Sequence, residues 1–464
     1  MNSHITPDDF YSDCPPERII GIECEYNLQQ GISSPGVLIP ISSYMTPEAI
    51  ARAGLSIFGK SKFLDNGGGI YADIGDHLEY DTPECLGPQE AAAADMAGTV
   101  IIRRIVEASE LPHNGLFRLT GSNTEANDIV YTSGYHENYL FPRSAADSYL
   151  IDDLLPAYAA SCIWGLSGMV GASYVFSQKI WGIAGKPISR FIDERRTGHQ
   201  KPMFIIPPIE SDHDTIGHHA WARVERRYAD AGLSPEVRFM QLATMSLVLR
   251  MIEHADKIGP KRLEQISLKN PVKAAHIFAA NLALNKTVLT KDDERVTAQD
   301  IQKKFIEMAK DLNCKIKLPD DEVRAIYLWE NIIDGFGSSQ PDQVEYGDLV
   351  KMLDVAARHV VLARKLGPGS ITNINPQAVA LNLIWDRLLP VGGAQIWWKK
   401  FPSESVPPKL IDEMLNGTRL PKTRAAIRIH QLKHNSDNIA WLNWASIRYK
   451  NNTTTVLDDF YATS

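Results

Sequence analysis

Asn66-Gly67-Gly68-Gly69-Ile70-Tyr71-Ala72-Asp73-Ile74-Gly75-Asp76-His77-Leu78-Glu79-Tyr80-Asp81-Thr82-Pro83-Glu84-Cys85 is the stretch that decides the fold. After the glycines its side chains alternate in character. Because successive side chains of an extended chain point to opposite faces, one face is expected to be apolar and the other to carry carboxylates and a phenol. The polar set is Tyr71, Asp73, Glu79 and His77, and the apolar set is Ile70, Ala72, Ile74 and Leu78. Such hard oxygen ligands are typical of divalent-cation sites. A solvent-exposed strand with chance acids is the alternative.

A second extended segment with paired acids lies upstream, over residues 18–26. Glu23 and Glu25 are two residues apart, so they share one face of an otherwise apolar strand. Such a strand either lies at the edge of a sheet or faces a polar cleft. The acids of the 66–85 stretch favour the cleft.

Charge, cysteines and hydropathy restrict the class of protein. The 464-residue chain has a formal net charge of −8 and no long basic run, which argues against nucleic-acid binding. Its five cysteines are scattered without CxxC spacing, so we expect neither a disulfide framework nor a zinc knuckle, but a reducing, cytoplasmic compartment. No signal peptide is expected before Glu17. The uncharged segment 154–176 is rich in small and polar residues, so we expect buried core rather than a membrane helix.

The order of predicted elements indicates an α+β protein, because acid-bearing strands come early and helices dominate the second half. Helices are predicted over 47–58, 235–258, 298–313, 320–334 and 343–366, and from Pro88 to about Leu111. A Pro- and Ser-rich break at 401–408 suggests a boundary. We therefore predict a disordered or loosely docked N-terminal extension (1–17), a large domain (18–400) and a small C-terminal domain (401–464).

Three blocks of sequence carry a family likeness. They are Gly21-Ile-Glu-Cys-Glu-Tyr26, the 66–85 stretch, and His136-Glu137-Asn138-Tyr139. Together they resemble the Pup ligase and depupylase family, which is related to glutamine synthetase and the carboxylate–amine ligases. Weaker blocks extend the resemblance, in order, from Arg18 to Trp444. The interval from Tyr26 to Asn66 is short, as in the ligase branch.

The resemblance implies a curved, mainly antiparallel sheet that forms an ATP cradle, with helices outside and a small C-terminal domain. It also implies residue roles. The magnesium-site positions are Glu23, Tyr71 and Glu79, the catalytic base is Asp73, and the nucleotide contacts are Thr82 and Trp444. Gly69 stands where the family has an arginine, and Arg424 is our candidate to replace it at the nucleotide, with Arg428 as an alternative.

The resemblance further implies an ATP- and Mg²⁺-dependent ligase that forms an amide through an acyl phosphate. Its partners would be a small Pup-like modifier, which supplies a C-terminal glutamate, and a lysine-bearing target protein or an amine small molecule. Departures at 121–124 and 206–225 leave three alternatives open. These are a depupylase or deamidase that hydrolyses such bonds, a relative retargeted to a small molecule or another peptide, and an inactive scaffold.

Two other motifs are weaker. His213, His218 and His219 lack a zinc spacing, since no cysteine is near. The run Gly67–Gly69 is not followed by the Gly-Lys-Ser/Thr of a Walker loop, so it is expected to be a turn.

Overall fold

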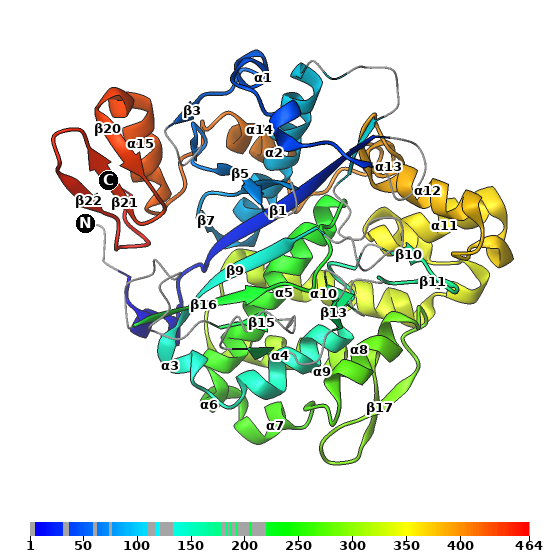
Figure 1. Cartoon of the computed structure of the whole chain (residues 1–464). Coiled ribbons are helices and arrows are strands. Elements are labelled where there is room, and N and C mark those ends of the chain that lie inside the picture. Colours follow the sequence, from blue (N-terminus) through cyan, green and yellow to red (C-terminus); the bar gives the residue numbers. More distant parts are fainter. Residues whose placement is uncertain are drawn as a thin grey trace.

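A large sheet organises the molecule in the computed structural model (Figure 1). The structure describes residues 5–463 except 31–36, 59–62, 74–76, 110, 112–116, 121–132, 167, 178–181, 184–185, 188–191, 194–203 and 207–219. The sheet order is β14 (Ile192–Asp193), β15 (Phe204–Ile205), β16 (Trp221–Arg226), β9 (Tyr135–Pro142), β1 (Ile19–Gln30), β6 (His77–Asp81), β5 (Gly69–Asp73), β4 (Phe63–Leu64) and β3 (Ile57–Phe58). Four further strands join it: β2 (Val37–Leu38), β7 (Cys85–Leu86), β8 (Phe117–Thr120) and β19 (Arg387–Leu389). Along this path only β14 and β15 pair in parallel.

Strand β1 is the centre of this sheet, because it pairs with β6 on one side and β9 on the other. Its register places Glu25 opposite Glu79 and Glu23 opposite both Asp81 and His136. The two acidic strands predicted from the sequence are therefore neighbours. The 66–85 stretch contains the antiparallel strands β5 and β6, and residues 74–76 between them are outside the described residues.

The face of the sheet opposite the acids is buried under helices. Ile20, Ile22 and Leu78 are at most 1% exposed and belong to the main core, as does Ile70. This side of the sheet faces α2 (Gly87–Ala108) and α5 (Pro235–Glu253), which also pack on each other. The alanines at 91–94 let α2 approach closely, since they add no bulk. The predicted alternation is confirmed at Ile70 and Leu78, which are buried. It is wrong at Ala72, which is exposed, and Ile74 lies outside the described residues.

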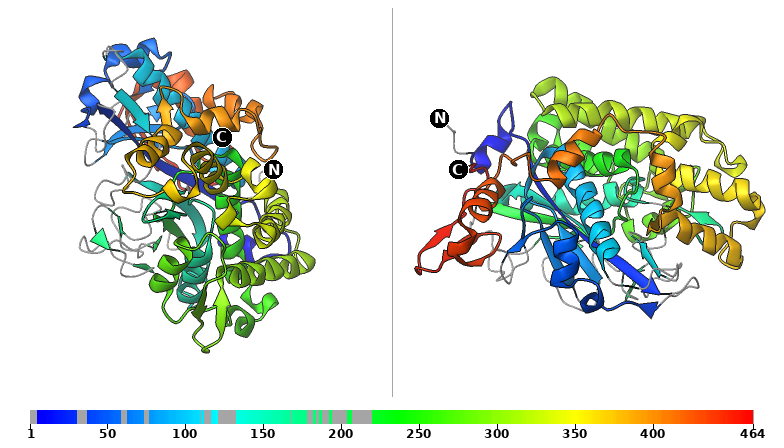
Figure 2. Two further views of the ribbon diagram at one scale, coloured as in Figure 1. Left: turned by 90° about the vertical axis from the view of Figure 1, so that its right-hand side faces the viewer. Right: turned by 90° about the horizontal axis from the view of Figure 1, so that it is seen from above.

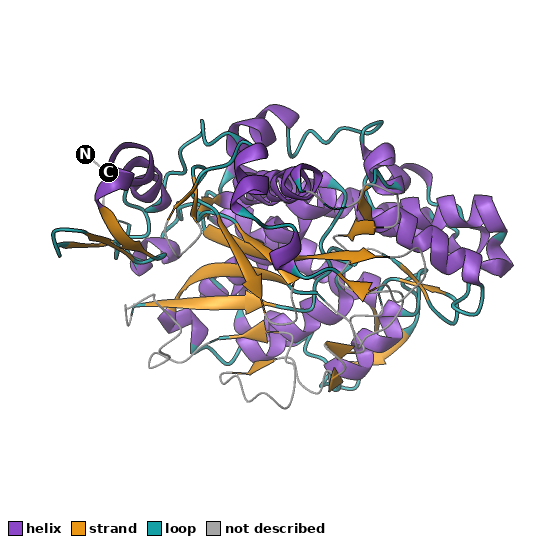
Figure 3. Cartoon of the chain, turned by 45° about the horizontal axis from the view of Figure 1, so that its top comes forward, coloured by secondary structure: helices purple, strands orange, loops and turns teal. Residues whose placement is uncertain are grey.

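Helices form most of the second half, as predicted (Figure 3). The longer ones are α4 (Ile151–Ser161), α9 (Ala298–Lys315), α10 (Asp320–Ser338), α11 (Asp354–Leu366) and α12 (Pro376–Asp386). The shorter ones are α1 (Pro47–Arg52), α3 (Arg143–Ala146), α6 (Ala255–Ile258), α7 (Pro260–Glu264), α8 (Pro271–Ala279) and α13 (Gly393–Trp398). Hairpins form between β10 (Met169–Val170) and β11 (Tyr174–Val175), β12 (Gly182–Ile183) and β13 (Lys186–Pro187), and β17 (Thr287–Leu289) and β18 (Arg295–Thr297).

Segment 154–176 is buried core, as expected, and is divided between α4 and the β10–β11 hairpin. Within the described ranges, every helix is too short or too polar to cross a membrane. All five cysteines are free thiols.

The helix predicted over 343–366 is wrong at its beginning. Residues 347–351 form a 3₁₀ turn, and the α-helix begins only at Asp354. Val344 and Gly347 have φ angles of 61° and 53°, in the left-handed region that a right-handed helix excludes. The helix predicted over 47–58 likewise ends at Arg52, before Gly54 at a φ of 73°.

The last part of the chain is a small unit at one edge of the molecule, drawn in red in Figures 1 and 2. It contains α15 (Ala425–Asn435) and the sheet β20 (Ile439–Leu442), β21 (Ser446–Tyr449) and β22 (Thr454–Val456). Its apolar core comprises Leu432, Leu442, Ile447 and Leu457 and includes Phe63 of β4. The preceding helix α14 (Pro408–Leu415) packs on α2 instead.

The N-terminal segment packs against this architecture. Its 3₁₀ turn, Pro7–Tyr11, buries Phe10 completely between Trp221 and the guanidiniums of Arg18 and Arg250. The segment expected to dock loosely therefore contributes an aromatic anchor to a small cluster that also contains Phe460.

Candidate active site

Three carboxylates from neighbouring strands converge on the open face of the sheet. Oxygens of Glu25 on β1, Asp73 on β5 and Glu79 on β6 all lie within 4.8 Å of one another. The strand register explains this, because Glu25 pairs with Glu79 and Glu79 pairs with Tyr71, two residues before Asp73. Clustered carboxylate oxygens of this kind suit Mg²⁺ or Ca²⁺.

Two carboxyl groups on this face, those of Glu79 and Asp81, have raised pKa values. Burial raises the pKa of Glu79 to about 8, reinforced by the negative charges of Glu23, Glu25 and Asp73. Burial and the neighbouring Glu79 and Glu23 likewise hold the pKa of Asp81 well above its usual range. Acids so crowded resist ionisation unless a cation accompanies them.

Two histidines flank the cluster. His77 Nδ1 lies 2.6 Å from Glu25 Oε2, and His136 Nδ1 lies 3.0 Å from Glu23 Oε2. Burial opposes ionisation of Glu25, but the hydrogen bond with His77 and the charge of His136 outweigh it, and the pKa of Glu25 falls to about 2. Glu25 is therefore an anionic centre of this face.

The wall formed by β9 and β16 supplies amide and guanidinium groups. Asn138 Nδ2 donates to Glu23 Oε1 at 3.2 Å, and Arg223 Nη1 donates to Asn138 Oδ1 at 3.1 Å. Arg223 also lies 3.4 Å from Glu225 Oε2. Glu137, between His136 and Asn138, points to the back face instead, where it is fully buried with Arg226.

Tyr71 and Trp444 join the sheet to the C-terminal unit. The Trp444 side chain interacts with the Tyr71 phenol, and burial raises the pKa of that phenol above its ordinary range. Trp444 packs edge-on against Phe63, with ring centroids 4.8 Å apart. A side chain at Gly69 would meet the Tyr71 ring, since an added Cβ would lie 2.7 Å from it. The glycine at this position therefore makes room for the tyrosine.

A buried ion-pair cluster holds Trp444 in place. The Glu84 carboxylate accepts hydrogen bonds from Arg424 Nε, at 2.8 Å, and from both terminal nitrogens of Arg428. Burial works against the charge, but the two guanidiniums lower the pKa of Glu84 to about 2. Arg428 also donates to the Trp444 carbonyl at 2.9 Å and lies 4.8 Å from the ring centroid.

A cavity of about 250 Å³ opens between these two walls. Its lining contains Glu23, Thr82, Arg424 and Trp444, together with Arg223. The Thr82 hydroxyl accepts a hydrogen bond from the Ile22 amide at 3.0 Å, and this bond ties Thr82 to the first half of β1. Tyr71, Asp73 and Glu79 lie outside the lining of this cavity, but Glu23 and Asp81, which line it, are close enough to Glu79 to influence its ionisation.

The predicted site residues form two adjoining groups. Tyr71, Asp73 and Glu79 lie on β5 and β6, and the cavity is lined by Glu23, Thr82, Arg424 and Trp444. Glu23 lies close enough to Glu79 for its negative charge to raise the pKa of Glu79. The tightest carboxylate set, however, joins Glu79 to Glu25 and Asp73 rather than to Glu23. Sequence reasoning assigned no role to Asp81, although it lies in the 66–85 stretch, and it missed Arg223 and the pairing of Arg424 and Arg428 with Glu84. The departures noted at 121–124 and 207–219, including His213, His218 and His219, lie outside the described residues.

This fold and site define a class of α+β protein. Its mainly antiparallel sheet carries a carboxylate cluster suited to a divalent cation, beside a cavity lined by arginine and tryptophan. Within that class the particular family is shown by sequence. The family described as Pup-ligase protein matches residues 18–448, and the chain belongs to it. The family likeness inferred from the three sequence blocks is confirmed.

Curated relatives support the same assignment. The chain is 28% identical over 338 residues to the Pup–protein ligase of Acidimicrobium ferrooxidans, covering 68% of each chain. It is 26% identical over 433 residues to that of Kribbella flavida, covering 86% of this chain and 88% of the relative.

Two solved structures share the fold, each at 20% identity. One is the complex between the prokaryotic ubiquitin-like protein Pup and its ligase PafA, with a TM-score of 0.77 over 97% of this chain and 90% of that one. The other is the Pup ligase PafA in complex with ADP, with a TM-score of 0.73 over 91% and 90%. The predicted α+β class with a large antiparallel sheet agrees with both.

Proposed function

We propose that this protein is an ATP-dependent carboxylate–amine ligase that attaches the C-terminal glutamate of a Pup-like modifier to a lysine amine. The observation that carries the proposal is the carboxylate cluster of Glu25, Asp73 and Glu79 beside the cavity edged by Trp444 and Arg424. Membership of the Pup ligase family supports it. The relatives are named as ligases, and the structural neighbours were solved with Pup and with ADP.

The residues fit the magnesium that such a reaction uses. Their oxygens are hard ligands, and the raised pKa of Glu79 marks a site that gains from a cation. Glu23 and Glu79, with Tyr71 beside them, would hold the metal, and Glu25 adds a further carboxylate. When bound, the metal supplies charge neutralisation at the transferring phosphoryl group.

The protein's own residues then have separate duties. Trp444 offers an aromatic face for a nucleotide base, and Thr82 and Arg424 line the same cavity. Asp73 accepts a proton from the attacking lysine amine, which must become neutral before it can attack an activated carboxyl group. The pocket walls position the modifier's glutamate between these groups, so that the carboxylate and the amine meet with water displaced.

The experiment that tests the proposal is a conjugation assay. The protein is incubated with ATP, Mg²⁺, a Pup-like modifier ending in glutamate and a lysine-bearing target, and the products are measured by intact mass. We expect a target heavier by one modifier minus one water, with one ADP formed for each bond. The Asp73→Asn variant serves as the matched control.

The same assay separates the alternative of a depupylase or deamidase. That enzyme would release the modifier from a purified conjugate, with nucleotide needed only in catalytic amount. Release without continued ATP consumption, and no conjugate formed, would refute the ligase proposal. Formation of an amide on a small amine but not on protein lysine would redirect the acceptor to a small molecule.

A further inference from the structure

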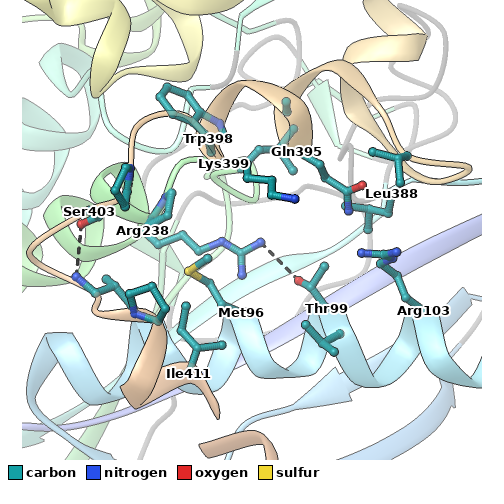
Figure 4. Close-up of a pocket in the computed structure, with 18 of the residues that line it drawn as sticks. Met96, Thr99, Arg103, Arg238, Leu388, Gln395, Trp398, Lys399, Ser403 and Ile411 are labelled. Carbon is teal, nitrogen blue, oxygen red and sulfur yellow. Dashed lines mark hydrogen bonds between the residues drawn. The ribbon is translucent and has the colours of Figure 1, made fainter.

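A second and larger cavity lies away from the acidic face. It has a volume of about 550 Å³ and is enclosed by α2, the start of α5, the β19–α13 segment and α14. Pockets of roughly 300–1,000 Å³ are typical of small-molecule sites. Figure 4 shows residues of α2 facing residues of α13 across this space.

The body of the cavity is apolar. Its walls include Met96, Val100, Leu233, Leu388 and Ile411. These side chains come from four separate segments, so the cavity belongs to the packed core between elements and not to a single loop. An apolar body of a ligand would gain about 25 cal/mol for each Å² that it buries here.

The rim of the cavity is cationic, although the protein as a whole carries a net charge of −8. Arg103, Arg387 and Lys399 line it, and in Figure 4 the Arg103 guanidinium and the Lys399 amine point into the space between α2 and α13. Of the acids, Asp386 also lines it, but Asp386 is already paired with Arg358. Arg103 has only the half-exposed Glu107 as its ion-pair partner among the described residues.

Several polar atoms of this lining have no hydrogen-bond partner within the described part of the chain. They are the Nε atoms of Arg103 and Arg387, Nε1 of Trp385 and Oε1 of Gln395. Trp385 is 3% exposed, so its indole N–H is a buried donor without an acceptor. Three of these atoms are donors and Gln395 Oε1 is an acceptor, and all four are closed to solvent, so they mark incompletely paired polar groups in the cavity wall.

The cavity lies behind the acidic strand, not beside it. Thr99 forms part of its wall, and the Thr99 hydroxyl is 3.0 Å from the hydroxyl of Tyr26, the residue after Glu25. Tyr26 is on the back face of β1, so a ligand here would not compete with one on the acidic face.

We propose that this cavity is a second binding site, for a small amphiphilic carboxylate whose apolar body fills the α2–α13 space and whose anionic group meets Arg103 and Lys399. The proposal is independent of the ligase activity. The volume favours a free small molecule, and the positive rim selects an anion over a neutral compound of the same length.

Dodecanoate and its neutral counterpart dodecanol are the probes, each measured by displacement of the fluorescent anion 8-anilinonaphthalene-1-sulfonate from the full-length protein in 0.15 M salt without ATP. We expect saturable one-site binding of dodecanoate and markedly weaker binding of dodecanol. The double variant Arg103→Ala/Lys399→Ala is expected to weaken dodecanoate about tenfold, since two charge-assisted contacts are removed.

The control is Arg104→Ala/Lys400→Ala, which removes the same net charge from the next residue in each segment. Arg104 and Lys400 are exposed and lie outside the lining, so dodecanoate affinity is expected to stay within about twofold, because exposed charges at a distance are screened. Equal loss in both double variants, equal affinity for acid and alcohol, or the lack of saturable binding would each overturn the proposal.

Discussion

Replacing Glu84 by glutamine tests how the C-terminal unit is held against the sheet. Glutamine keeps the shape of the side chain but removes the charge that two buried guanidiniums share. Arg424 and Arg428 have side chains that are 5% and 0% exposed, and the Glu84 side chain is 14% exposed. Uncompensated buried charge of this kind typically costs about 3–5 kcal/mol.

The pKa of Glu84 gives an independent magnitude. Its folded value of about 2 lies below the ordinary value of 4.5. A depression of that size corresponds to roughly 3 kcal/mol of stability. Because the folded pKa is depressed, this stability is fully present above pH 4.5 and is lost as the pH falls toward 2. The stability difference between wild type and Glu84→Gln should therefore shrink over the same interval.

Urea denaturation followed by tryptophan fluorescence measures the free energy of unfolding, and limited proteolysis reports whether residues 425–457 detach. We expect Glu84→Gln to be about 3–5 kcal/mol less stable at pH 7. It should also have a raised KM for ATP, because Arg428 loses the partner that holds it against Trp444. Glu404→Gln is the matched control, since Glu404 is exposed. A Glu84→Gln variant as stable as the control at pH 7, with no change in the interval below pH 4.5, would refute this account of the clamp.

Three further predictions concern the acidic face. The Asp73→Asn variant should still bind ATP, as measured by calorimetry, but its turnover should fall about a hundred- to ten-thousand-fold. Full activity of this variant would exclude Asp73 from the mechanism. Glu79→Gln should raise the Mg²⁺ concentration needed for ATP binding. In wild type that requirement should fall about tenfold per pH unit from pH 6 to 8, because the raised pKa of Glu79 makes protons compete with the metal. An unchanged magnesium titration in both experiments would exclude Glu79 as a ligand. Trp444→Ala should weaken ATP binding while Trp441→Ala, at an exposed position, leaves it unchanged, and equal effects would dismiss the stacking role.

The local alternation of residues was readable from the sequence because side-chain direction in a strand depends only on position along the chain. It predicted that Tyr71, Asp73 and Glu79 share one face and that Glu23 and Glu25 share another strand's polar side. In the 136–138 run only the structure separates Glu137 from its neighbours, because it turns Glu137 to the back face with Arg226. Family likeness from three short blocks was likewise available before any coordinates.

The partner of each residue was decided only by tertiary structure. Glu25 meets Asp73 and Glu79 because of the strand register, and Glu84 meets Arg424 and Arg428 across some 340 residues of chain. No local pattern encodes such pairings, since they depend on how strands align and helices dock. The late start of α11 has a similar cause, because Asp354 at its first turn binds the amides of the distant residues Leu233 and Ser234. The sequence determined which side chains share one face of a strand. Long-range packing determined which of these side chains contact one another.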